Sequence, residues 1–471
     1  MGDRRVACAD AIGDPRSANS RGEGSVVSES TAPAAMVYPP ARIAWYTMAV
    51  LGLLYAFSMI DRQIPNLLLV YIRRDLNISD TMVSLLAGFA FALFYATSAL
   101  PISRIADQWS RKSVIFIGVV LWSLMTCLCG LSSSFVQFFI ARMGVGLGEA
   151  SLTPSAFAMA SELFPPHKQA RATSVFSIGP AIGGGLSLIM GGVLIGLAER
   201  AGPIVLPIVG SLKVWQIVLI AIGLLTLLTT VPLSAIHDPV RYTRSRPGIA
   251  NPANPSISAV LLALWHGRGG FVPLFFGVPL LSMAAYGIAA WTPTYFIRVY
   301  GWNAHDTGII FGAVQIVAGI ASALVAAWIS DRTRAAGRLD APFLVLLVLL
   351  VAVIPLPLAL AAFPDPRVGL AMVALMNLAI SPVACLAPVA LQAITRDGMR
   401  AQVTALFLLI TNIVGIGLGP TVVAATTDFV FRNPNAVGWS MGVVGSAAYA
   451  LSASILYLGR RFYRTEVEKG D

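Results

Sequence analysis

Twelve long apolar stretches constrain the fold of this chain more than any other feature. Most of them reach about the 20 residues that a helix needs to cross a bilayer. Only 11% of the 471 residues are charged, whereas 57% are hydrophobic. The stretches occupy residues 43–71, 82–102, 114–131, 135–163, 172–197, 214–233, 271–297, 307–329, 342–363, 368–394, 403–423 and 438–458. We therefore expect an all-α polytopic membrane protein, because strands of an outer-membrane barrel would alternate in hydrophobicity.

The order of the stretches predicts two bundles of six transmembrane helices, at residues 41–233 and 271–461. The polar, proline-rich residues 234–270 are expected to form a cytoplasmic linker, in which residues 257–265 are apolar enough for a short interfacial helix. Residues 1–40 lack the apolar core of a secretory signal and are predicted to be a disordered cytoplasmic tail. Residues 462–471 are predicted to be a second cytoplasmic tail.

Positive charges predict the orientation. If both termini are cytoplasmic, inner segments hold 23 of the 32 Lys and Arg, outer loops hold 7, and Arg62 and Arg142 are the remaining two. This asymmetry follows the positive-inside rule and predicts a multi-pass inner-membrane protein. The net charge of +10 then mainly reflects orientation, together with attraction to anionic membrane lipids, and no nucleic-acid partner is expected.

Two charged turns resemble each other at a separation of 331 − 107 = 224 residues. Each follows the second apolar stretch of its half, so the halves repeat in parallel. We expect charges at these turns and at nearby inner helix ends to form a conformational latch. The residues are Asp107, Arg111, Lys112, Glu162, Arg171, Asp331 and Arg332.

Apart from Glu162 at the inner end of its stretch, the charged residues inside the apolar stretches are Asp61, Arg62, Arg142 and Glu149. A charge within the bilayer is costly, so each is a candidate functional residue. Asp61 and Glu149 are expected to couple protons, and Arg62 and Arg142 to bind an anionic substrate. Because Arg142 and Glu149 are seven residues apart, nearly two helical turns, they face the same way. The proton affinity of Glu149 should therefore depend on whether Arg142 is free or holds substrate.

Structural explanations of these charges remain open. Asp61 and Arg62 can mark the point where the first helix leaves the membrane, since residues 43–61 nearly cover a bilayer. Arg142 and Glu149 can form a buried structural ion pair, although such a pair can still titrate.

The second half offers neutral polar and aromatic side chains inside its apolar stretches. Gln315, Asn377, Asn412, Tyr286 and Trp291 are expected to give a substrate hydrogen bonds and apolar contact area. An amphipathic substrate would suit both halves. The sequence lacks a His-Glu-x-x-His metal pattern and a Gly-x-Ser-x-Gly elbow, so we expect no metal, no cofactor and no enzyme activity.

Two motifs resemble the major facilitator superfamily. The first is the turn Ser103-Arg104-Ile105-Ala106-Asp107-Gln108-Trp109-Ser110-Arg111-Lys112, which is similar to the family pattern Gly-x-Leu-Ala-Asp-Arg-x-Gly-Arg-Lys. It has serine at two glycine positions and Gln108 at an arginine position. The second, which includes Gly179, Pro180, Gly183 and Gly184, resembles the antiporter motif Gly-Pro-x-x-Gly-Gly-x-Leu and predicts close helix packing.

Further motifs resemble the spinster-like branch of this superfamily, whose eukaryotic members export sphingosine-1-phosphate or lysophospholipids. They are Ile60-Asp61-Arg62, Asp75-Leu76-Asn77-Ile78-Ser79-Asp80, Gly146-Leu147-Gly148-Glu149-Ala150-Ser151 and Glu162-Leu163-Phe164. The resemblance implies a monomeric secondary transporter that uses protons to move a small amphipathic, anionic or lipid-like substrate by alternating access. A general multidrug or organic-anion carrier is the alternative within transport, and an intramembrane enzyme or a sensor is the alternative outside it.

Overall fold

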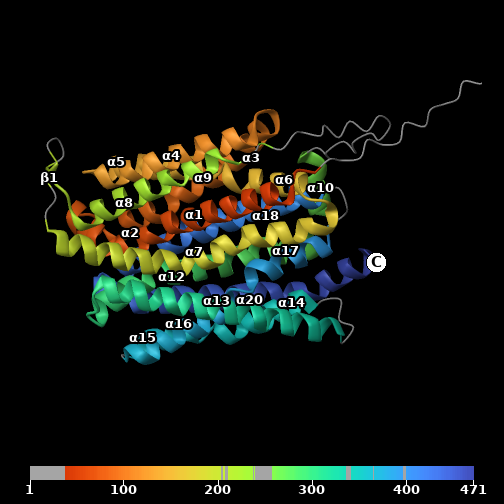
Figure 1. Cartoon of the computed structure of the whole chain (residues 1–471). Helices are drawn as coiled ribbons and strands as arrows, with labels where there is room; N and C mark the ends of the chain where they lie inside the picture. Colours follow the sequence, from red (N-terminus) through yellow and green to blue (C-terminus); the bar gives the residue numbers. More distant parts are fainter. Residues whose placement is uncertain are drawn as a thin grey trace, which may run out of the picture. The chain divides into compact units, whose positions relative to one another are not determined.

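The computed structural model describes residues 38–202, 205–206, 210–236, 238, 257–335, 341–363, 365–395 and 399–470. In this part of the chain the structure is helical, apart from one short antiparallel hairpin of β1 (Val205–Leu206) and β2 (Gly210–Ser211). The long helices lie side by side with their axes roughly aligned (Figure 1). The predicted disordered tail (residues 1–37) and most of the predicted linker (residues 239–256) fall outside the described residues.

The first half contains helices that match the first six apolar stretches. Its elements are α1 (Ala41–Leu76), α2 (Asp80–Ser84), the π-helical η1 (Leu85–Phe89), α3 (Ala90–Gln108), α4 (Arg111–Leu131), α5 (Phe135–Glu149), α6 (Leu152–Leu163), α7 (Pro166–Ala201), α8 (Val214–Leu228) and α9 (Thr230–Ser234). Serines begin several of them, because a serine oxygen can accept an otherwise free amide hydrogen of the first turn. Ser79, Ser110 and Ser134 each accept from the amide three residues ahead.

The second half begins with a short helix, α10 (Ile257–His266), at the place where the sequence predicts one. The remaining elements are α11 (Arg268–Val272), η2 (Pro273–Gly277), α12 (Val278–Val299), α13 (Ala304–Ala335), α14 (Ala341–Val353), α15 (Leu356–Ala362), α16 (Pro366–Ile380), α17 (Val383–Ala393), α18 (Arg400–Asn412), η3 (Ile413–Leu418), α19 (Gly419–Ala425), η4 (Thr426–Phe431), η5 (Pro434–Ala436) and α20 (Val437–Gly470). The α20 helix thus continues through the predicted second tail as far as Gly470.

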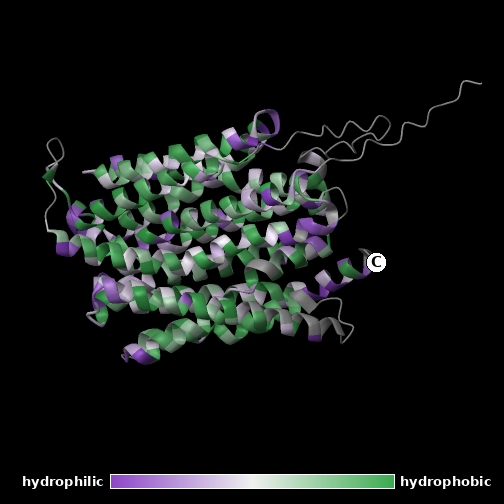
Figure 2. Ribbon diagram, viewed as in Figure 1, coloured by the Kyte–Doolittle hydropathy of each residue, from purple (hydrophilic) through white to green (hydrophobic). Residues whose placement is uncertain are grey.

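Ten of the described helices are long and apolar enough to cross a membrane. The other two expected segments, the fourth of each half, are present but interrupted, as α5 with α6 and α16 with α17. Hydrophobic residues cover the lengths of the helices, and hydrophilic residues gather toward their ends (Figure 2). The described helices therefore agree with twelve membrane-crossing segments.

Both interruptions lie at related places in the two halves. In the first half the helix breaks at Ala150 and Ser151, and in the second at Ser381 and Pro382. The separation of 381 − 150 = 231 residues is close to the 224 residues between the two charged turns. Proline explains the second break, because it lacks an amide hydrogen and restricts the residue before it.

The two halves meet where α7 crosses α13. A Cβ atom added to Gly312 would lie 2.5 Å from the carbonyl oxygen of Gly185, and one added to Gly185 would lie 2.6 Å from the carbonyl oxygen of Gly312. Glycine at both positions lets the two backbones touch. The predicted packing motif lies in the same helix, where Gly179 and Gly183 contact α1 and Gly184 contacts the amide of Gln315.

We predict that Gly312→Leu destabilises the protein, because a side chain at this crossing would push α7 and α13 apart. Overpacking of this kind typically costs about 1–3 kcal/mol. Gly319→Leu on the same helix is the matched control, since nothing lies within 4 Å of a Cβ atom placed there. Thermal unfolding in detergent should show a lower melting temperature for Gly312→Leu alone. Equal melting temperatures for the two variants would show that α7 and α13 do not pack closely at Gly312.

Candidate functional site

A buried ion pair joins α1 to the end of α5. Arg62 Nε lies 2.7 Å from Glu149 Oε2, and the glutamate side chain is fully buried. Ser58, one helical turn before Arg62, donates a hydrogen bond of 2.6 Å to the same oxygen. The other oxygen, Oε1, has no hydrogen-bond partner among the described residues. One carboxylate oxygen of Glu149 is therefore bonded to Arg62 and Ser58, and the other has no hydrogen-bond partner in the described residues.

Asp61 is the second buried acid of the site. Its Oδ1 accepts a hydrogen bond of 3.1 Å from Thr126 on α4, whereas Oδ2 has no hydrogen-bond partner in the described part of the chain. Asp61 and Glu149 also repel each other electrostatically. The site therefore holds two buried carboxyl groups that interact electrostatically.

Arg142 makes different contacts from those expected. The sequence predicts that Arg142 faces the same way as Glu149 and binds an anion, whereas in the structure Arg62 forms the ion pair with Glu149. Arg142 instead donates to the carbonyl oxygens of Asp61, Leu86 and Ala87, at 3.3, 3.3 and 3.0 Å. It is only 2% exposed. In this structure its guanidinium forms hydrogen bonds with backbone carbonyls of α1 and η1.

Aromatic rings surround the guanidinium of Arg62. Its Cζ lies 4.4 Å from the ring centre of Tyr95 and 4.9 Å from that of Phe91. Tyr55 and, from the second half, Tyr286 also interact with it electrostatically. Arg62 keeps 15% of its side chain exposed and Tyr286 is 43% exposed. These rings can contact an apolar group beside the cation.

The other predicted substrate residues do not join this cluster in the described structure. Trp291 is fully buried and donates from Nε1 to the carbonyl of Pro420 at 2.9 Å, which packs α12 against α19. Asn377 donates to Val373 within its own helix. Gln315 faces Gly184 at the contact between the halves, and Asn412 is half-buried before η3.

Three predicted latch residues, Asp107, Arg111 and Lys112, lie where α3 ends and α4 begins. Arg111 pairs with Glu162 and, at 3.7 Å, with Asp107. Lys112 donates from Nζ to the carbonyl of Ser234 at 2.7 Å. These contacts all lie within the first half.

The remaining latch residues make no link between the halves in the described contacts. Arg171 is exposed on α7, and Arg332 lies 4.5 Å above the ring of Trp328. The side chain of Asp331 falls outside the described part of the structure.

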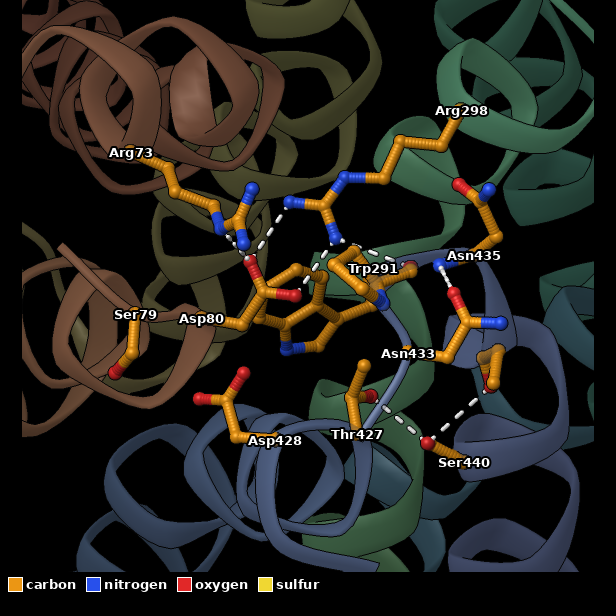
Figure 3. Close-up of polar contacts among 12 residues, drawn as sticks. Arg73, Ser79, Asp80, Trp291, Arg298, Thr427, Asp428, Asn433, Asn435 and Ser440 are labelled. Atoms are coloured by element: carbon orange, nitrogen blue, oxygen red, sulfur yellow. Dashed lines mark hydrogen bonds and ion pairs between the residues drawn. The ribbon is translucent and has the colours of Figure 1, made fainter. Parts of the chain in front are cut away.

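Sequence reasoning missed a second charged cluster, at the opposite end of α2 and α3 from Asp107. Asp80 is fully buried and receives 2.7 Å contacts from both terminal nitrogens of Arg298, at the end of α12. Arg73 adds a third contact, at 2.8 Å. Figure 3 shows the two arginines reaching Asp80 from different helices, with Trp291 beside Arg298.

A further contact joins the halves beside this cluster. Asp428 accepts hydrogen bonds from the amide and the hydroxyl of Thr81, both at 2.7 Å. Asp80 and Thr81 belong to the first half, whereas Arg298 and Asp428 belong to the second. We call these four residues and Arg73 the Asp80 cluster. Charge at a helix end is common, and the partners are 218 residues apart, so sequence alone gave no signal of the pairing.

No group of three or more His, Cys, Asp or Glu side chains in the described residues could hold a metal ion. The arrangement around Arg62 offers a partly exposed cation paired with a buried carboxylate, a second buried acid and aromatic surfaces.

Comparison with known proteins agrees with this architecture. An MFS-type efflux pump of Mycolicibacterium smegmatis is 26% identical over 434 residues, covering 90% of this chain and 95% of that protein. Protein spinster homolog 1 of Xenopus laevis is 28% identical over 278 residues, which span 56% of this chain and half of that relative. A crystal structure of a bacterial homolog to the human lysosomal transporter Spinster, in an inward-facing and unoccupied conformation, has a TM-score of 0.73 at 22% identity. The superposed region covers 91% of this chain and 98% of the homolog's chain.

The family model described as Major Facilitator Superfamily matches residues 51–420. That match includes the charged residues of α1 and α5 and most of both halves. The chain therefore belongs to the Major Facilitator Superfamily of membrane transporters.

Proposed function

We propose that this transporter uses a proton gradient to move a small amphipathic substrate with an anionic head group across the inner membrane by alternating access. The observation that carries the proposal is the Arg62–Glu149 pair. Its arginine is the one charged group of the site that is both partly exposed and surrounded by aromatic rings. The guanidinium matches a phosphate or carboxylate, and the rings match an apolar chain.

Exchange at Arg62 would couple substrate to protons. An anionic head group that binds Arg62 displaces the carboxylate of Glu149. A buried carboxylate without a cation is costly, and a proton removes its charge. When the substrate leaves, Glu149 can release the proton and pair with Arg62 again. Asp61, which repels Glu149, assists as the second acceptor. By linkage, substrate and proton each bias the binding of the other.

Alternating access also requires that the two ends of the transporter close in turn. The Asp80 cluster links the halves at one end, where its four cross-half residues bring both halves into contact. At the Asp107 end, the described contacts of Arg111 with Glu162 and of Lys112 with Ser234 lie within the first half. We infer that this structure is closed at the Asp80 end and that opening there breaks the bonds of Asp80 and Asp428.

A second candidate is a broad multidrug or organic-anion exporter. It is favoured by the likeness to the M. smegmatis efflux pump, which extends over 90% of this chain. Growth of a pump-deficient bacterium that expresses this chain, in the presence of structurally unrelated drugs, tests that candidate. Resistance to several drugs, without lysophospholipid transport, would favour the exporter.

We predict that Glu149→Gln separates binding from coupling. Glutamine keeps the shape but cannot carry a proton. Proteoliposomes with the variant should therefore exchange a fluorescent lysophospholipid in counterflow but should not accumulate it when a pH gradient is applied. Glu199→Gln is the matched control, because Glu199 accepts a hydrogen bond from Tyr71 away from the site. Full accumulation by Glu149→Gln would remove Glu149 from the coupling role.

We also predict that Arg62→Lys weakens binding of the same lysophospholipid by roughly tenfold, because lysine cannot hold an anion with two parallel hydrogen bonds. Arg62→Gln should abolish binding. Fluorescence titration in detergent measures both variants, with Arg104→Gln as an exposed arginine control. Wild-type affinity in Arg62→Gln would show that Arg62 is not the anion ligand.

The closure at the Asp80 end gives a further prediction. Removing one partner of a buried charge pair typically costs about 3–5 kcal/mol, so Arg298→Gln should open this end. Ser84 is 1% exposed on the same helix as Asp80. A cysteine at position 84 should react with a membrane-impermeant maleimide at least tenfold faster in Arg298→Gln.

Arg367→Gln serves as the control for that measurement, because Arg367 is an exposed arginine at the start of α16. An unchanged labelling rate in Arg298→Gln would mean that the charge pair does not hold this end closed.

A further inference from the structure

The three hydrogen bonds of Arg142 lead to a role that the proposed cycle does not assign. Two of its acceptors, Leu86 and Ala87, belong to η1, the π-helical turn between α2 and α3. The third is the backbone carbonyl of Asp61. π-Helical turns are rare within helices and often occur at functional sites. A side chain that bonds to helix carbonyls also bends the helix.

The η1 turn is part of the contact between the two halves. A Cβ atom added to Gly88 in η1 would lie 2.5 Å from the carbonyl oxygen of Ile416 in η3. Gly417 of η3 in turn lies against Phe89. Two π-helical turns, one from each half, thus pack directly against each other. A change in the shape of η1 would alter this contact.

Asp61 competes for the same guanidinium. Its carboxylate and Arg142 attract each other electrostatically, and its Oδ2 has no hydrogen-bond partner in the described residues. The other groups that face Asp61 are Glu149, Arg62 and Thr126, together with the thiols of Cys127 and Cys129. Unlike these groups, Arg142 bonds to η1 in the described contacts.

We propose that Arg142 is a positioning residue that ties the charge of Asp61 to the packing of η1 against η3, and that it is not a substrate ligand. When Asp61 is protonated, Arg142 bonds fully to the carbonyls of η1 and keeps the π-helical turn. When Asp61 is ionised, its carboxylate draws the guanidinium away, and the turn loosens. The proton site thereby acts on the contact between the halves. This inference rests on the proposed proton coupling.

Hydrogen exchange of the amides of residues 85–92 tests the link in the full-length protein. Asp61→Asn, which mimics the protonated acid, should slow this exchange several-fold, and Arg142→Gln should speed it. Adding Asp61→Asn to Arg142→Gln should not change the exchange rate further, because the effects of residues that act through one another are not additive. Arg142→Lys provides a second variant if Arg142→Gln does not fold, and Arg104→Gln is the control on α3.

Two further readouts separate positioning from simple stabilisation. In the wild type, exchange of residues 85–92, corrected for its intrinsic pH dependence, should change with pH, and in Arg142→Lys this change should be lost. Binding of the fluorescent lysophospholipid should survive in Arg142→Gln and be lost in Arg62→Gln.

An effect of Asp61→Asn that is the same with and without Arg142 would overturn the inference. So would loss of lysophospholipid binding in Arg142→Gln with unchanged exchange in η1. If the double-variant result holds but the wild type shows no pH-driven transport, the proposed function fails and the link between Asp61 and η1 stands. If transport is pH-driven but the variants behave additively, only the link fails.

Discussion

The neutralisation of two acids inside the membrane determines how the first half is arranged. Glu149 is fully buried and depends on Arg62 and Ser58 for its charge partner and hydrogen bond. A buried charge without a partner costs far more than a typical protein can tolerate. The pairing fixes the rotation of α1 against α5, and with it the place of the aromatic rings around Arg62. The same neutralisation makes the pair sensitive to any anion that competes for the arginine.

Most of the fold and part of the site could be predicted from the sequence. The twelve apolar stretches set the helices, and the cost of charge in a membrane singled out the four charged residues of α1 and α5. Their contacts could not be predicted, because the break at Ala150 and Ser151 and the rotation of each helix decide which nitrogen reaches which oxygen. The seven-residue spacing therefore favours Arg142 as the cation near Glu149, whereas Arg62 forms the ion pair. The sequence predicts Trp291 as a substrate residue, because aromatic side chains can either pack in a core or contact a ligand. Its full burial shows that it packs in the core of this structure.

The two halves share a scaffold but differ in chemistry. Both interrupt their fourth segment, at Ala150–Ser151 and at Ser381–Pro382. In the first half the residue before the break is Glu149, whereas in the second the corresponding region has Asn377 and apolar neighbours. Among the described contacts, Arg298 and Asp428 of the second half bond to Asp80 and Thr81 of the first half at the Asp80 end. In the proposed cycle, proton exchange at Glu149 and closure at Asp80 therefore occur at different places along the helices.

The charge balance of the central cluster determines which driving force can act on the proposed cycle. Two acids, Asp61 and Glu149, stand with two arginines, Arg62 and Arg142, so the empty cluster is neutral when both acids are ionised. A monoanionic head group together with one proton leaves it neutral again. A cluster that carried one net charge would gain or lose about 2.3 kcal/mol for every 100 mV of membrane voltage that it crossed. With no net charge to move, the cycle would be electrically silent and would draw its energy from the chemical gradient of protons alone.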